Sequence, residues 1–188
     1  MYGFPYSLCI SVNEAVVHGF PNSNELKEGD IVSVDCGVNK NGFHADSAYT
    51  YAVGEISSDI EKLLSVTKKS LFAGIEKAVV GNRIGDIANA IQRFNEDEGY
   101  GIVRELVGHG LGKKMHEDPE MPNYGRRGRG KKFLEGMTVA IEPMVNLGTR
   151  RIEQLSDRFS EIPIKFEPRF GGRVRDRDAS QTHGDDEG

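Results

Sequence analysis

The sequence lacks the features of a membrane protein or of a disulfide-stabilised secreted protein. No apolar run approaches the roughly 20 residues that cross a bilayer. The first residues, MYGFPYSLCIS, have neither the basic start nor the long apolar stretch of a signal peptide. The only cysteines, Cys9 and Cys36, form no C-x-x-C pair, which favours reduced thiols in a cytoplasmic protein over a disulfide between them.

An excess of positive charge is also missing. The formal net charge of −5 argues against nucleic acid as the main partner. The chain of 188 residues is long enough for one domain with a real core, and its 37% apolar and 28% charged residues are typical of a soluble globular protein.

A hairpin is predicted in the stretch DIVSVDCGVNKNGFHADSAYTYAV, where two strand-like runs flank the turn-forming letters NKNG. If Val38 pairs with Phe43 across a four-residue loop, Asp35 lies directly opposite Asp46. Facing carboxylates repel, so they need a cation between them or one must take up a proton. Solvated surface aspartates are the alternative, but the apolar strands around both residues favour a metal site.

Two helices are expected after the hairpin, over residues 58–80 and 84–98, because apolar residues recur there at helical spacing. Ser58 and Glu61 form a capping box at the start of the first helix. A hairpin followed by two helices predicts an α+β fold with helices packed on a mainly antiparallel sheet.

Three histidines are candidates for chemistry. Glycines on both sides of His109 remove packing contacts and let a ligand or backbone approach the imidazole. His116 belongs to a proline-containing loop, so one of these two histidines could bind metal while the other meets substrate. His18, between a valine and a glycine, could lie at the rim of a pocket, although an ordinary histidine is the alternative.

Glu142 is a third acidic candidate, because it ends the predicted buried strand 138–141 just before a proline. A carboxylate there is costly unless a cation meets it. Together with Asp35, Asp46 and His109, it describes a site for one or two divalent ions. Such a site could hydrolyse an amide, an ester or a phosphate ester.

Two further segments are unusual in composition. Residues 125–132, GRRGRGKK, are expected to form a solvated basic loop, with contact to an anion or ribosomal RNA as the lesser alternative. From Arg158 onward the chain is rich in Arg, Asp and Gly, which is typical of disorder. We therefore expect a catalytic domain over residues 1–155 and an atypical, disordered or frame-shifted tail over residues 156–188.

Four ordered motifs, CISVNEAVVHGFP, DIVSVDCGVNKNGFHADSAYTYAVG, GHGLGKKMHEDP and GMTVAIEPM, resemble type I methionine aminopeptidases. The resemblance runs from about Gly3 to about Leu155. It implies the pita-bread fold, in which two related α/β halves hold two divalent ions (cobalt, manganese, iron, zinc or nickel). It also implies a cytoplasmic monomer that removes the initiator methionine from nascent chains with a small second residue. Proximity to the ribosome is expected, and neither a membrane nor a specific nucleic acid is an expected partner.

The resemblance also implies roles for single residues. Asp35, Asp46, His109 and Glu142 would be metal ligands, with Asp46 bridging both ions. The remaining residues would bind substrate or act in catalysis: His18 and His116 at the substrate backbone and scissile carbonyl, Phe4 and Cys9 in the pocket for the methionine side chain. Met115 falls where the family usually has an aromatic residue.

The chain departs from the family pattern in two places. The opening helix of the family has no counterpart, and the fifth ligand, a glutamate in a late strand, is not found, since Glu167 is a poor match. We therefore expect the chain to bind about one ion, to be poorly stable and to cleave substrate slowly or not at all. The alternatives are a prolidase-like dipeptidase of the same fold and a catalytically dead module that binds peptides.

Overall fold

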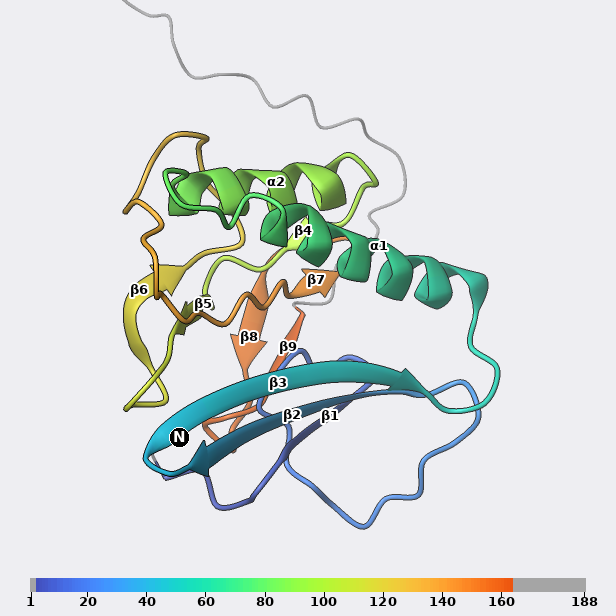
Figure 1. Ribbon diagram of the computed structural model, residues 1–188. Coiled ribbons are helices and arrows are strands. Elements are labelled where there is room, and N and C mark those ends of the chain that lie inside the picture. The colour runs from blue at the N-terminus through green and yellow to red at the C-terminus, as the bar shows by residue number, and fades with distance from the viewer. Residues whose placement is uncertain (1–2, 164–188) are drawn as a thin grey trace, which may run out of the picture.

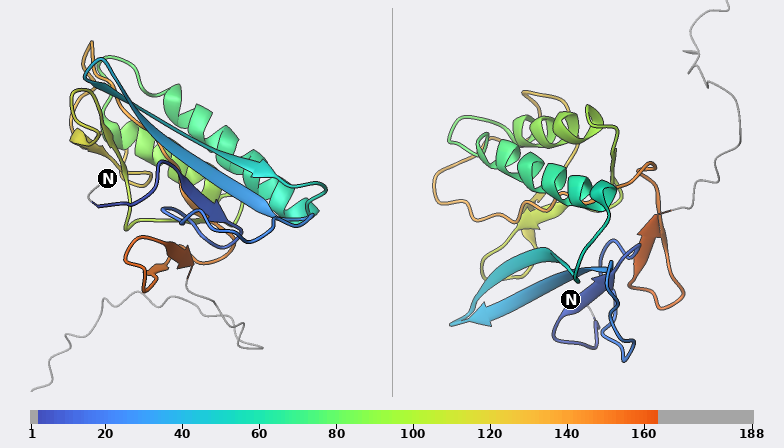
Figure 2. Two further views of the ribbon diagram at one scale, coloured as in Figure 1. Left: turned by 90° about the horizontal axis from the view of Figure 1, so that it is seen from below. Right: turned by 90° about the vertical axis from the view of Figure 1, so that its right-hand side faces the viewer.

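The computed structural model describes residues 3–163, which form a helical layer and a three-stranded sheet with short strands between them (Figure 1, Figure 2). The sheet has the order β1-β2-β3, and three two-stranded ladders pair β4 with β7, β5 with β6 and β8 with β9, all antiparallel. The α+β expectation is therefore confirmed. The elements are β1 (Cys9–Val12), β2 (Ile31–Lys40), β3 (Phe43–Ala52), α1 (Ser58–Ile75), α2 (Ile84–Glu96), β4 (Gly101–Ile102), β5 (Gly108–Gly110), β6 (Glu117–Met121), β7 (Val145–Asn146), β8 (Ile152–Gln154) and β9 (Glu161–Pro163).

The predicted hairpin is present, but its predicted register is wrong. The turn is the two-residue loop Asn41–Gly42, with φ of 54° and 81°, because Asn-Gly adopts the positive φ angles that a tight hairpin turn needs. Asp46 consequently faces Gly37, and Asp35 faces Ala48. The two aspartates still share one face of the sheet, as diagonal neighbours rather than a facing pair.

The first helix begins at the predicted residue, Ser58, and ends earlier than predicted. Its N-cap is Ser57, whose hydroxyl accepts a hydrogen bond from the Ile60 amide at 3.4 Å, so the predicted capping box at Ser58 is not the one used. After Ile75 the backbone hydrogen bonds switch to tighter spacing, as in Ala78 N–H to Ile75 O. The helix therefore stops short of Val80.

The second helix ends at Glu96, two residues before the predicted end, and it carries the main core of the chain. Its residues Ile87 and Ile91 are 1% and 0% exposed, and they pack with Ile102, Met121 and other apolar side chains of the inner strands. Within residues 3–163 neither helix combines the length and apolar character that a bilayer span needs.

The segment 138–144 is extended but only half-buried, so the prediction of a buried strand there is wrong. The Ala140 amide donates to His109 O at 2.7 Å, and the His109 amide donates to Ala140 O at 3.2 Å. Because these bonds pair the segment with β5 at a single bridge between Gly110 and Val139, it lies beside β5 without being enclosed.

The end of the described chain also differs from expectation. Residues 158–163, expected to be disordered, enter the β8–β9 hairpin, and the Val16 amide donates to Glu161 O at 2.7 Å. This bond ties the hairpin to the N-terminal segment. Residues 164–188, with the poorly matching Glu167, lie outside the described residues, and the proposed division at residue 155 stays a prediction.

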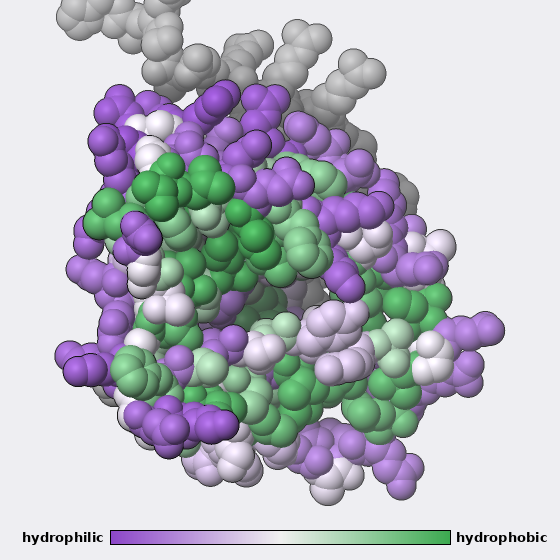
Figure 3. Space-filling view, in the orientation of Figure 1, coloured by the Kyte–Doolittle hydropathy of each residue, from purple (hydrophilic) through white to green (hydrophobic). Residues whose placement is uncertain are grey.

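Apolar side chains are exposed on both layers. Figure 3 shows apolar surface above and below a hollow on one face of the molecule. The exposed large apolar residues of α1 and its C-terminal turn are Phe72, Ile75, Val79 and Val80, and those of the hairpin are Val38, Phe43, Tyr49 and Tyr51.

Candidate metal centre

Three of the four predicted ligands come together from separate elements. Asp46 lies on β3, His109 on β5, and Glu142 on the segment that runs beside β5. One donor atom of each lies within 4.8 Å of the others. The side chains of Asp46 and His109 are only 8% and 11% exposed, which removes these donors from bulk water.

The hydrogen bonding of His109 defines which ring nitrogen faces the carboxylates. Its Nδ1 lies 2.9 Å from Gly110 O, an atom that can only accept, so Nδ1 carries the proton. In the neutral ring, Nε2 then presents a lone pair 3.4 Å from Asp46 Oδ2 and 3.4 Å from Glu142 Oε1. Glu142 Oε1 is buried and has no hydrogen-bond partner. Three electron-pair donors facing one another fit a bound cation.

The pKa values of the carboxyl groups show the cost of this arrangement without a cation. Burial, then the charges of Asp46 and Asp35, raise the pKa of Glu142 to about 8. Burial, then the charge of Asp46 and a hydrogen bond that protonated Asp35 donates to Asp46, raise the pKa of Asp35 to about 6. Asp35, the fourth predicted ligand, therefore lies close to Asp46. A divalent ion would relieve the repulsion between these groups.

His116 lies beside the cluster. Its ring centroid is 4.2 Å from that of His109, and the two rings meet edge to face. Burial lowers the pKa of His116, and any charge on His109 lowers it further, which favours a neutral ring with one N–H to donate. The structure thus gives His116 a position next to the predicted ligands.

His18 occupies a constrained backbone position beside β1, where the neighbouring Gly19 accepts a hydrogen bond from the Ile10 amide. Its φ is 57°, in the left-handed region that non-glycine residues rarely adopt. Burial lowers the pKa of its ring, partly offset by a hydrogen bond to the Phe159 backbone. The Ser160 hydroxyl donates to the His18 carbonyl at 3.4 Å. His18 is therefore held by the β8–β9 hairpin.

The two residues predicted to line a pocket have different neighbours. The ring of Phe4 contacts Phe20 and Phe159, with centroids 5.4 and 5.5 Å away. Cys9 is buried on β1 opposite Asp35, and burial, followed by the charges of Asp35 and Asp46, raises the pKa of its thiol to about 12. Cys9 and Cys36 are both free, as predicted.

Phe159 is a residue of this region that sequence reasoning missed. It belongs to the segment assigned to the tail by composition. The available signal was Asp157, whose Oδ1 accepts hydrogen bonds of 2.8 Å from both the Phe159 and Ser160 amides. An aspartate that caps the following two amides is typical of an ordered turn.

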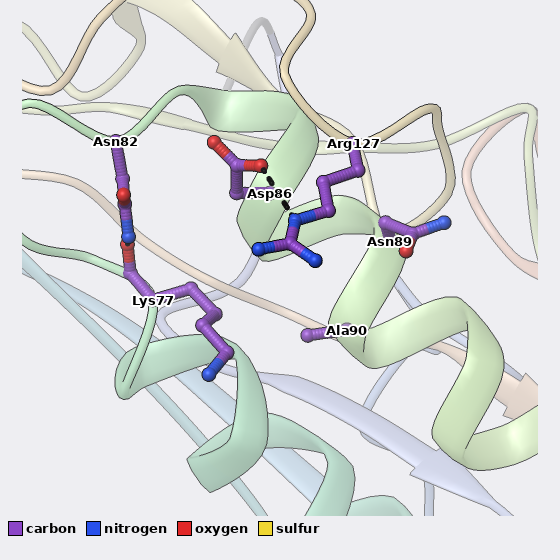
Figure 4. Close-up of a pocket in the computed structure, with 6 residues that line it drawn as sticks. All are labelled: Lys77, Asn82, Asp86, Asn89, Ala90 and Arg127. Carbon is purple, nitrogen blue, oxygen red and sulfur yellow. Dashed lines mark hydrogen bonds and ion pairs between the residues drawn. The ribbon is translucent and has the colours of Figure 1, made fainter.

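A separate cavity of about 330 Å³ lies at the start of α2, away from the cluster (Figure 4). Arg127, from the predicted basic loop, has a side chain 89% exposed and lies 3.9 Å from Asp86. Solvation of this loop is confirmed, and the Gly128 amide anchors it by donating to Asp86. The lining residues are Lys77, Asn82, Asp86, Asn89, Ala90 and Arg127, none of which is a predicted site residue.

The family model for metallopeptidase family M24 matches residues 1–173, nearly the whole chain. The chain belongs to metallopeptidase family M24. An M24 protein uses divalent metal ions, which agrees with the donor set formed by Asp46, His109 and Glu142.

Within family M24, the chain is similar to several methionine aminopeptidases. The chain is 59% identical to a methionine aminopeptidase of Clostridium perfringens over 162 residues, covering 86% of this chain and 65% of that protein. The structure matches that of a methionine aminopeptidase from Thermotoga maritima with a TM-score of 0.81 and 44% identity, covering 84% of this chain and 64% of that one. It also matches a methionine aminopeptidase from Rickettsia prowazekii with a TM-score of 0.83 and 38% identity, covering 86% of this chain and 66% of that one. This M24 chain spans about two thirds of the length of these relatives.

A prolidase from Thermococcus sibiricus shares the fold at lower similarity, with a TM-score of 0.63 and 24% identity over 84% of this chain and 41% of that one. The fold common to these structures is the pita-bread fold, as the sequence motifs predicted.

Proposed function

We propose that this chain is a metal-dependent aminopeptidase that removes the N-terminal methionine from peptides and nascent proteins with a small second residue. The observation that carries the proposal is the convergence of Asp46, His109 and Glu142 beside His116. The similarity to methionine aminopeptidases, which exceeds that to the prolidase in both identity and TM-score, supports the substrate class.

The ligands would be Asp46, His109 and Glu142 for one divalent ion, and Asp35 with Asp46 for a second ion that is bound markedly more weakly. A divalent ion held by such groups supplies Lewis acidity toward water and a peptide carbonyl. His109 contributes a fixed tautomer, because its Nδ1–H is engaged by Gly110 O.

His116 and His18 would act on the peptide. The neutral His116 ring can donate an N–H to the oxygen of the scissile carbonyl, where negative charge develops during hydrolysis. His18, held in place by the Ser160 hydroxyl at its carbonyl, would contact the substrate backbone. Phe4 and the buried Cys9 would form apolar walls suited to an unbranched thioether side chain.

The test separates metal binding from turnover. Metal-free protein is titrated with manganese or cobalt by calorimetry, and hydrolysis of Met-Ala-Ser is followed alongside. His109→Ala should lose metal, whereas His116→Ala should keep metal and lose turnover by roughly 10²–10³. His44→Ala, a half-buried histidine outside the cluster on the same hairpin, is the control.

Each outcome has a distinct meaning. Metal binding without cleavage of Met-Ala-Ser in the unmodified chain would favour a peptide-binding module. Cleavage of a dipeptide ending in proline in preference to Met-Ala-Ser would favour a prolidase-like activity. Unchanged metal affinity in His109→Ala would refute the ligand assignment, and equal metal loss in both histidine variants would refute their separate roles.

A further inference from the structure

The loop between β5 and β6 is fastened to the hairpin at two points (Figure 1). The His44 amide of β3 donates to Gly112 O at 2.7 Å. The Met115 thioether lies on the bare backbone of Gly37: a Cβ atom at position 37 would be 2.6 Å from Met115 Cε and 3.3 Å from its Sδ. Gly37 is the residue that faces Asp46 across the hairpin, so the second fastening lies next to the candidate metal centre.

The contact of Met115 with Gly37 constrains His116, because His116 is the next residue in the chain. The His116 side chain is otherwise largely exposed, yet its ring lies 4.2 Å from the ring of His109. Because neighbouring residues share a peptide unit, a Met115 side chain seated on Gly37 restricts the direction in which His116 projects. A methyl group at position 37 would force the end of the Met115 side chain to shift from its present place.

The Met115 side chain is only partly covered. Met115 is half-buried, whereas Met121, in the same β5–β6 unit, is 1% exposed. A thioether reacts with hydroperoxides wherever they can reach the sulfur, and the resulting sulfoxide is polar and bulkier. Met115 Sδ already lies 3.3 Å from the position that a Cβ on residue 37 would take, so the bulkier and polar sulfoxide crowds this contact.

We propose that Met115 is a site of oxidation by hydroperoxides, and that its sulfoxide leaves Gly37 and moves His116 away from His109. In the reaction, a sulfur lone pair attacks the outer peroxide oxygen and the O–O bond breaks. Sulfur is oxidised by two electrons, the peroxide is reduced to water or an alcohol, and the proton passes to the departing oxygen. Met115 is a positioning residue in this scheme, since it acts through His116.

The first measurement locates the oxidation. The full chain is treated with hydrogen peroxide, its thiols are then reduced with dithiothreitol so that Cys36 is restored, and peptides are examined by mass spectrometry. We expect Met115 sulfoxide to form at least about tenfold faster than Met121 sulfoxide, because of the difference in exposure. Equal rates at the two methionines would overturn the proposal.

The second measurement follows the position of His116 by NMR. Ring protons of His116 and His109 should show a strong nuclear Overhauser effect, which peroxide abolishes in the unmodified chain but leaves intact in Met115→Leu. Gly37→Ala should weaken the same signal without peroxide, because its methyl group displaces the Met115 Cε. A signal that survives complete oxidation of Met115, or that Gly37→Ala leaves unchanged, would overturn the proposal. Neither measurement uses turnover or bound metal, so the result is independent of the proposed function.

Discussion

Replacing Glu142 with glutamine removes one charge from the candidate metal centre while keeping the shape of the side chain. In the metal-free protein, burial and the charges of Asp46 and Asp35 raise the pKa of Glu142 from 4.5 to about 8. Between these two pH values the unfolded chain has released this proton and the folded chain still holds it. The free energy of unfolding of the metal-free protein therefore falls as the pH rises from 4.5 to 8.

The size of this fall follows from the pKa change. Each tenfold change in proton affinity corresponds to about 1.4 kcal/mol, so a rise from 4.5 to about 8 gives an upper value of about 5 kcal/mol. Because the Glu142 side chain is 33% exposed, solvent screening reduces the expected effect to about 2 kcal/mol. Glu142→Gln, which cannot ionise, avoids this loss.

The assay is urea unfolding with a metal chelator at pH 4.5 and pH 8.5. Glu142→Gln should match the unmodified chain at the lower pH and exceed its stability by about 2 kcal/mol at the higher pH. Asp35, whose pKa is raised to about 6, is present in both proteins, so the difference between them reports Glu142. Exposed Glu135→Gln is the matched control. An identical pH dependence in Glu142→Gln and the unmodified chain would refute the reasoning.

Three other changes have clear expected outcomes. Arg158 has a φ of 69°, so Arg158→Gly should raise the free energy of unfolding by about 0.5–1 kcal/mol in urea titrations; a loss would contradict the strain. Gly74→Ala places a methyl group 2.7 Å from Ile91 Cδ1 between the helices and should cost about 1–3 kcal/mol, whereas a gain would show that the helix pair adjusts freely. At pH 8, iodoacetamide should label Cys36 at least about a hundredfold faster than Cys9, whose thiol pKa is about 12; comparable labelling would contradict the burial of Cys9.

The hairpin illustrates how far the sequence predicts the site. Side chains alternate between the two faces of a strand. Asp35 and Asp46 therefore share one sheet face in the predicted register and in any register that differs from it by an even number of residues, so the shared face was predictable. The register itself depends on which letters of NKNG form the turn. Local preference for Asn-Gly decided this in favour of the two-residue loop, and the facing pair became a diagonal one.

Contacts between segments distant in the sequence were harder to predict from the sequence. Glycines around His109 indicated close approach of another backbone, and Gly108 does meet the Ala140 carbonyl oxygen, which leaves no room for a Cβ atom. No local pattern predicted that Phe159 would meet Phe4 and Phe20, because the meeting depends on the β8–β9 hairpin returning to the N-terminal segment. Composition favoured disorder there, whereas the Asp157 turn and that hairpin produce order.

The sharing of one hairpin by Asp35 and Asp46 has a consequence for the order of folding. Hairpins close in about 1–10 µs, well before contacts between remote segments form. The two aspartates are therefore brought together early, while His109 and Glu142 arrive only when β5 and the segment beside it dock. During that interval the hairpin carries a pair of like charges without their remaining partners. A divalent cation captured at this stage would offset their repulsion and speed the later docking steps.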